Sequence, residues 1–166
     1  MTKPVPPGEP PKTLSRRFWL RTTALLGLAL TLSLRGRPAA AGADAPFAQP
    51  DAAGPTAFLD RAFAMRRQAE AAGDQAYGAV VARDGRIVGQ APSAVVTRGD
   101  PTAHAEMEAI RDAARRLGRR DLSGCTLYSS SRPCPMCEAA AYWAGIERMV
   151  HGTAATDAGP PRLGRC

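Results

Sequence analysis

The chain has 166 residues, which is enough for one domain with a hydrophobic core but too few for two. Its formal charge of +7 is concentrated at one end: residues 1–43 hold seven lysines and arginines against one acid, whereas residues 44–166 hold fifteen arginines against fourteen acids. A nearly neutral domain lacks the broad basic surface that binds RNA or DNA, so we expect a small-molecule partner and not a nucleic acid.

The first 43 residues have the pattern of an export signal. Residues 15–21, Ser-Arg-Arg-Phe-Trp-Leu-Arg, resemble the twin-arginine motif, in which paired arginines precede an aromatic residue and a leucine. The uncharged apolar stretch 22–34 is shorter than the roughly 20 residues that span a bilayer, and small residues at 39–43 offer cleavage sites. We therefore expect residues 1–43 to be a signal peptide that directs the protein through the twin-arginine export machinery to the periplasm or the extracellular space. An uncleaved membrane anchor is the alternative.

Helix and strand patterns alternate through the rest of the chain. Residues 44–55, rich in alanine and proline, indicate a linker, and residues 56–73 carry apolar side chains at the spacing of a helix. Two β-rich runs, 76–83 and 86–91, flank an Asp-Gly pair, which is a strong hairpin signal. Residues 92–99 are expected to form a loop.

Further elements are expected after this loop: a helix that begins near Pro101, a buried strand at 125–130, a helix at 133–144 and a strand at 147–152. Alternating helices and strands after a hairpin predict a three-layer α/β/α sandwich. We place this domain at residues 56–158 and a short tail at 159–166.

Two short motifs thirty residues apart supply the donors of a zinc site. They are His104-Ala-Glu106 and Pro133-Cys134-Pro-Met-Cys137. One neutral imidazole and two thiolates give zinc three protein ligands and leave the fourth tetrahedral position for water. Zinc lowers the pKa of such a water to about 7, and Glu106, two residues from the histidine, is placed to move its proton.

Helix starts are expected to position these ligands. Cys134 and Cys137 fall in the first turn of one expected helix, where residues three apart share a face. The partial positive charge of a helix N-terminus lowers the pKa of a thiol there. His104 falls in the first turn of another helix, so the sequence predicts that two helix starts converge on one metal ion.

Residues 100–106, Asp-Pro-Thr-Ala-His-Ala-Glu, and 133–137, Pro-Cys-Pro-Met-Cys, together resemble the cytidine and deoxycytidylate deaminase superfamily. The most similar branch holds guanine deaminases, cytosine deaminases and bacterial tRNA adenosine deaminases. The resemblance covers residues 56–157 and implies a mixed central sheet, a homodimer and hydrolytic deamination of a free nucleobase or nucleoside. In that reaction zinc-bound hydroxide attacks the ring carbon that carries the amine, and Glu106 passes a proton to the departing ammonia.

The resemblance also implies substrate contacts. The backbone N–H of Ala105 would contact a ring carbonyl. Ser93 lies where many members have a base-binding asparagine. Asp157, in Thr-Asp-Ala, resembles an aspartate that reads the amino edge of guanine, which favours guanine slightly over cytosine and adenosine. Arg132 departs from the family, because many members have glutamate there, and the C-terminal elements of relatives look absent or very short.

Three other functions remain open at this stage. A tRNA adenosine deaminase shares the same motifs, although the charge of the domain speaks against it. An exported thiol redox protein would use Cys134 and Cys137 as a reversible pair and would need no zinc. A degenerate zinc-binding domain would hold the metal without turnover.

Overall fold

The structure is a computed structural model that describes residues 46–163. The expected signal peptide, residues 1–43, lies outside the described residues, as do the first two residues of the expected linker and residues 164–166. No helix within 46–163 is long and apolar enough to cross a membrane.

A mixed five-stranded sheet forms the centre of the domain, in the order β2-β1-β3-β4-β5. Its strands are β1 (Gly78–Arg83), β2 (Arg86–Pro92), β3 (Cys125–Ser129), β4 (Arg148–His151) and β5 (Thr156–Gly159). β1 runs antiparallel to both β2 and β3, β3 runs parallel to β4, and β5 is antiparallel to β4. The expected mixed sheet is thereby confirmed.

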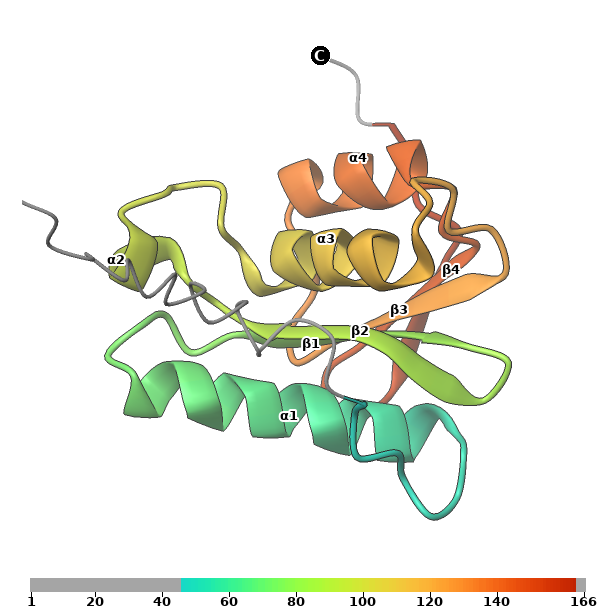
Figure 1. The fold of residues 1–166 in the computed structure, drawn as a ribbon, viewed down its shortest axis with the longest axis horizontal. Helices are drawn as coiled ribbons and strands as arrows, with labels where there is room; N and C mark the ends of the chain where they lie inside the picture. The colour runs from blue at the N-terminus through green and yellow to red at the C-terminus, as the bar shows by residue number, and fades with distance from the viewer. Residues whose placement is uncertain (1–45, 164–166) are drawn as a thin grey trace, which may run out of the picture. The chain divides into compact units, whose positions relative to one another are not determined.

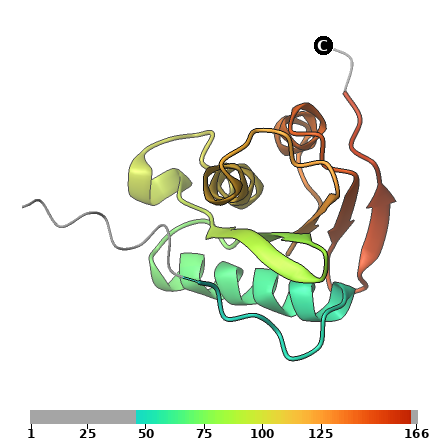
Figure 2. The ribbon, with the colours of Figure 1, turned by 45° about the vertical axis from the view of Figure 1, so that its right-hand side comes forward.

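Helices cover both faces of this sheet. α1 (Pro55–Ala71) packs on one face, and α3 (Ala105–Leu117) and α4 (Pro135–Trp143) lie side by side on the other (Figures 1 and 2). The short helix α2 (Val95–Arg98) follows β2. The expected three-layer sandwich is confirmed, and the face under α3 and α4 is the one that carries the two metal motifs.

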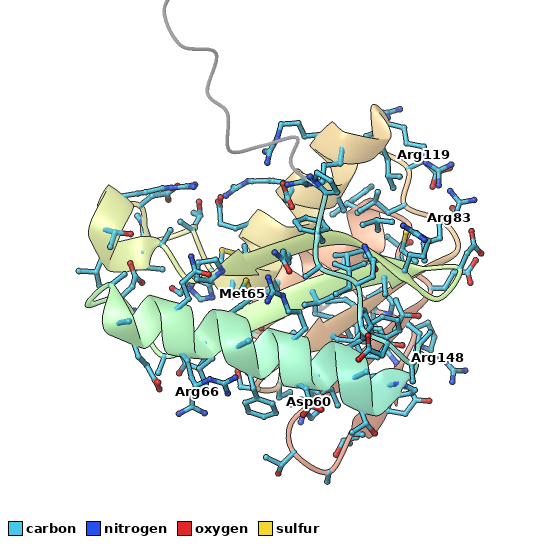
Figure 3. All side chains as sticks on the ribbon, turned by 60° about the horizontal axis from the view of Figure 1, so that its bottom comes forward. Asp60, Met65, Arg66, Arg83, Arg119 and Arg148 are labelled. Atoms are coloured by element: carbon cyan, nitrogen blue, oxygen red, sulfur yellow. The ribbon has the colours of Figure 1, made fainter. Side chains whose placement is uncertain are left out.

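α1 forms because its apolar residues share one side. Met65 lies between the helix and the sheet, whereas Asp60 is exposed on the side of α1 away from the sheet (Figure 3). Phe58 packs on Tyr128 of β3, with ring centroids 5.0 Å apart. α1 therefore anchors the face of the sheet opposite to the metal motifs.

Two glycines let helices approach the hairpin from both faces. A Cβ atom on Gly78 would lie 2.2 Å from the backbone of α1, and one on Gly89 would lie 2.6 Å from the backbone of α3. Atoms cannot approach so closely, so only glycine fits at either position. The close packing at Gly89 fixes the helix that begins beside the metal motif.

The expected hairpin is confirmed, because Asp84 and Gly85 form its turn, with φ of 48° and 73°. Positive φ at both central residues is typical of the tight turn between antiparallel strands. Residues 44–55 were expected to be a linker, but Gln49 within them packs on the domain. Its side chain accepts a hydrogen bond from the N–H of Ile87 and donates one to the Ile87 carbonyl, thereby pairing with the open edge of β2.

Three differences from the expectation go beyond a shift of one or two residues at the end of an element. α3 begins at Ala105 and not near Pro101, because the Asp100 carboxylate accepts hydrogen bonds from the backbone and hydroxyl of Thr102 and stabilises a turn instead. The expected loop 92–99 contains α2. β5 was not expected, so the folded domain extends to Gly159, one residue past the expected boundary of 158.

Candidate metal centre and active site

The three expected metal ligands converge on one point. The Sγ atoms of Cys134 and Cys137 lie 3.6 Å apart, and each lies 3.7 Å from Nδ1 of His104. In a tetrahedral zinc site, bonds of about 2.3 Å to sulfur and about 2.0–2.1 Å to nitrogen place two sulfurs about 3.8 Å apart and sulfur about 3.6 Å from nitrogen. All three edges match these values, so the donors are positioned to bind a single metal ion, and they fit zinc.

Two helix starts hold these donors. His104 is the residue before the first turn of α3, and Cys134 is the residue before the first turn of α4. A residue at this position commonly accepts a hydrogen bond from the helix backbone with its side chain, but neither His104 nor Cys134 does so. Both side chains are consequently available to a metal ion. Cys137, in the first turn of α4, supplies the third donor from the same helix.

The carboxylate of Glu106 lies beside this cluster. Its side chain is buried, its Oε1 accepts a hydrogen bond of 2.7 Å from the hydroxyl of Ser129, and its Oε2 lies 3.5 Å from Sγ of Cys137. A buried carboxylate needs a partner to offset its desolvation, and the Ser129 hydroxyl supplies one at the end of β3. The other oxygen remains on the metal side, where a general acid and base is required.

The pKa of the Cys137 thiol departs from the expectation that a helix start lowers it. Complete burial raises the pKa of the Cys137 thiol far above its usual range, and the negative charge of Glu106 raises it further. The helix start does not outweigh these two effects. A thiolate at this position therefore requires a cation in contact with the sulfur, which agrees with the metal-binding geometry.

The same distances bear on the thiol redox alternative. A disulfide requires sulfurs about 2.05 Å apart. The Cys134 and Cys137 sulfurs are separated by 3.6 Å, and a histidine nitrogen faces both of them. Three donors around one point favour a metal centre over a thiol pair.

The family model described as the cytidine and deoxycytidylate deaminase zinc-binding region matches residues 55–153. The chain belongs to this family. Zinc is accordingly the metal of the His104, Cys134 and Cys137 centre.

Members of the deaminase family with high similarity act on different substrates. Guanine deaminase from Bacillus subtilis is 43% identical over 102 residues, 61% of this chain and 65% of that protein. A tRNA-specific adenosine deaminase from Aquifex aeolicus is 40% identical over 93 residues, 56% of this chain and 62% of that protein. The crystal structure of the Bacillus guanine deaminase superposes with a TM-score of 0.56 over 57% of this chain and 61% of that one. The chain thus spans less than two thirds of the length of these relatives.

Ala105, whose backbone N–H the family resemblance assigns to a substrate contact, lies next to the metal motif. It is fully buried as the first residue of α3, between the ligand His104 and Glu106. Within residues 46–163 no acceptor is recorded for its backbone N–H, as expected for the first turn of a helix. The first turn of α3 therefore leaves this N–H without a partner in the helix.

Ser93 is buried, but its hydroxyl has a structural partner. It donates a hydrogen bond of 2.9 Å to Asp74, whose other oxygen accepts the N–H groups of Val96 and Thr97 at the start of α2. Partial desolvation acts to raise the pKa of Asp74, but the hydrogen bonds from Thr97 and Ser93 outweigh it and hold that pKa far below its usual range. The Ser93 hydroxyl therefore secures α2 through Asp74.

Asp157 is not brought to the metal centre. It is paired across the strands with Val150, whose side chain belongs to the core under α1, and its carboxylate accepts a 2.8 Å hydrogen bond from Arg148. Figure 3, viewed with α1 in front, shows Arg148 near one end of that helix. Alternate residues of a strand point to opposite faces, so Asp157 faces away from α3 and α4. Its position lends no support to the substrate contact inferred from the resemblance.

Ser129 is a residue of the candidate site that sequence reasoning missed, because its hydroxyl contacts Glu106. The sequence placed it in a buried strand, where a serine carries no signal of its own. The local hint is a buried polar residue at the end of β3, four residues before the cysteine motif begins at Pro133. Its role depends on the pairing of β3 with the helix that carries Glu106, which no local pattern contains.

Proposed function

We propose that the protein is a zinc-dependent hydrolytic deaminase of a free nucleobase or nucleoside, with guanine as the first candidate. The observation that carries this proposal is the buried Glu106 carboxylate beside three donors spaced for one zinc ion. The 43% identity to a guanine deaminase supports guanine as the first substrate to test.

Each residue of the site has a defined task in this proposal. Zinc supplies a Lewis acid that lowers the pKa of a water molecule to about 7. Glu106 accepts the proton of the attacking water through Oε2 and delivers it to the departing amine. Ser129 holds Oε1, so that only one carboxylate oxygen faces the reaction. The N–H of Ala105 orients the ring by donating to its carbonyl oxygen.

The test of this proposal is ammonia release by the zinc-loaded protein with guanine, cytosine, adenosine and guanosine. Glu106→Gln keeps the shape of the side chain but removes its proton-transfer capacity, so kcat is expected to fall by about 10²–10⁴-fold with one zinc per chain retained. Glu108→Gln is the matched control, because Glu108 lies on the same helix but pairs with Arg98 and Arg111. Full activity of Glu106→Gln would remove the role that we assign to this carboxylate.

A tRNA adenosine deaminase is the second candidate, supported by the 40% identity to the Aquifex enzyme. It predicts ammonia release from a tRNA anticodon stem-loop and none from free bases. Zinc bound without turnover of any substrate would indicate a degenerate zinc-binding domain instead, and absence of stoichiometric zinc would restore the thiol redox alternative.

We also propose that the protein is exported and works as a homodimer. The twin arginines support the export proposal, and replacing Arg16 and Arg17 with lysine is expected to trap the protein in the cytoplasm. The aromatic pair Tyr142 and Trp143 on α4 supports the dimer, since the side chains are 45% and 76% exposed. Analytical ultracentrifugation of Trp143→Ala and the unmodified protein tests the dimer, because the variant is expected to sediment as a monomer and the unmodified protein as a dimer.

A further inference from the structure

A cavity of about 340 Å³ lies between the first turn of α4 and strands β4 and β5. Arg132 and Pro133, which directly precede the ligand Cys134, form one wall, and Glu138, which follows the ligand Cys137, forms another. The cavity therefore adjoins the metal centre through the backbone of the cysteine motif. None of the metal ligands lines it.

Basic side chains dominate the lining. Arg132, Arg162 and His151 face the cavity, and Glu138 is the only acid among its lining residues. Within residues 46–163 no ion pair is recorded for Arg132 or Arg162, whereas Arg98, Arg111 and several others are paired with acids. Two unpaired arginines that share a cavity repel each other, and an anion between them would relieve this repulsion.

Asp157, the acidic residue of β5, does not line this cavity. Thr156 and Ala158 line the cavity, and Asp157 between them points to the opposite face and pairs with Arg148. The tail is fixed in turn, because the backbone N–H of Arg162 donates a hydrogen bond of 3.1 Å to Glu138. Arg162 therefore lines the same cavity as Arg132, and Asp157 does not.

We propose that this cavity binds a phosphate group. Guanidinium groups match the geometry of phosphate oxygens and bind them through paired hydrogen bonds, and the Thr156 hydroxyl offers a further donor. A phosphate monoester carries about −1.5 to −2 charges at neutral pH, and the two arginines, offset by Glu138, leave a net positive charge in the lining that attracts it. The cavity is large enough for the phosphate and part of the group that carries it, and Met149, Pro133 and Ala158 supply apolar wall.

The phosphate has two possible sources. Resting on the proposed deaminase function, it can belong to the substrate, which would then be a nucleoside 5′-monophosphate with its base at the zinc ion. It can also belong to a separate phosphate ion that binds beside a free base.

Calorimetric titration of the zinc-loaded protein with inorganic phosphate tests the site without reference to turnover. Arg132→Ala and Arg162→Ala are each expected to weaken binding about tenfold, and Glu138→Gln is expected to strengthen it. Arg67→Ala is the matched control, because Arg67 is an exposed arginine of α1 on the other face of the sheet. Affinity that is unchanged by Arg132→Ala, Arg162→Ala and Glu138→Gln, or no binding at millimolar phosphate, would overturn the proposal even if the protein deaminates a base.

A kinetic comparison separates the two sources. If the phosphate belongs to the substrate, kcat/KM for guanosine 5′-monophosphate exceeds that for guanosine at least tenfold, and Arg132→Ala lowers kcat/KM for the monophosphate more than for guanosine. If the ion is separate, the two substrates have equal kcat/KM values and added phosphate changes KM for guanine. If Arg132→Ala and Arg162→Ala weaken phosphate binding but the protein has no deaminase activity, the phosphate site is supported and only the proposed reaction is refuted.

Discussion

The hydroxyl of Ser129 lies 2.7 Å from Oε1 of Glu106, and the two side chains are 1% and 4% exposed. This contact joins the end of β3 to the first turn of α3 and fixes the carboxylate beside the metal ligands. It holds one oxygen of Glu106 and leaves the other on the metal side, where the proposed function requires proton transfer.

Loss of this contact is expected to lower activity without loss of zinc. Ser129→Ala leaves a buried carboxylate oxygen without its donor, which costs about 1–3 kcal/mol of stability, and kcat is expected to fall roughly tenfold as the carboxylate moves. KM and the zinc content should change little. Ser129→Thr keeps the hydroxyl and should recover most of kcat. Equal kcat values for the alanine variant and the unmodified protein would show that Ser129 does not position Glu106.

Zinc removal is expected to expose both cysteines of the centre. The loaded protein should bind one zinc per chain and react slowly with a thiol reagent, because both sulfurs are metal-bound. After chelation, Cys134 should react before Cys137, since Cys137 is fully buried and its thiol pKa is raised by burial and by Glu106. Mass spectrometry of labelled peptides measures the order. Equal labelling with and without zinc would contradict the ligand set.

Substitution of Gly89 is expected to disturb the site from a distance. Gly89→Ala would push a methyl group into the backbone of α3, 2.6 Å away, at a cost of about 1–3 kcal/mol. Gly78→Ala would place its methyl group 2.2 Å from the backbone of α1, on the other face of the sheet. Both variants should melt at lower temperature, and only Gly89→Ala should also lower zinc affinity and kcat in the folded protein. Equal losses of zinc affinity and kcat in the two variants would show that the packing of α3 at Gly89 does not control the geometry of the site.

Stability is expected to fall in acid partly through Asp74. The pKa of Asp74 in the folded protein is depressed, net of a desolvation effect that acts the other way, by hydrogen bonds from Thr97 and Ser93. Such a group stabilises the fold above its unfolded pKa of about 3.9, and the contribution is lost as pH falls through the lower folded pKa. Asp74→Asn should therefore be less stable at pH 7 and should lose less further stability below pH 4. Asp60→Asn, on the exposed side of α1, is the control in urea unfolding at both pH values.

The ligand set could be predicted from sequence because it depends on residue chemistry and spacing. A histidine and two cysteines three apart have few arrangements in which they share a cation, and the structure realises one of them. The start of α3 was misplaced because the Asp100 side chain has two uses, as a helix cap or as a turn acceptor, and the structure takes the second.

Features that depend on distant pairing were not predictable. β5, Thr-Asp-Ala-Gly, contains two residues that are rare in strands, and it becomes a strand only by pairing with β4. The same pairing sends Asp157 to the face opposite the metal centre, so a resemblance over three residues did not fix where its carboxylate points. The Ser129 contact likewise requires β3 and α3 to be placed in space.

The first turns of α3 and α4 leave the side chains of His104 and Cys134 unbonded to their own backbone. Each helix therefore gives up the stabilisation that a conventional cap would contribute, about 1 kcal/mol, and relies on the shared ion to tie the two starts together. Without that ion, the starts of α3 and α4 should unfold first, while α1 and the hairpin remain folded. A protease that cuts between residues 99 and 105 should then cleave the zinc-free protein faster than the zinc-loaded protein. The same difference in susceptibility would let a cell degrade the zinc-free form selectively.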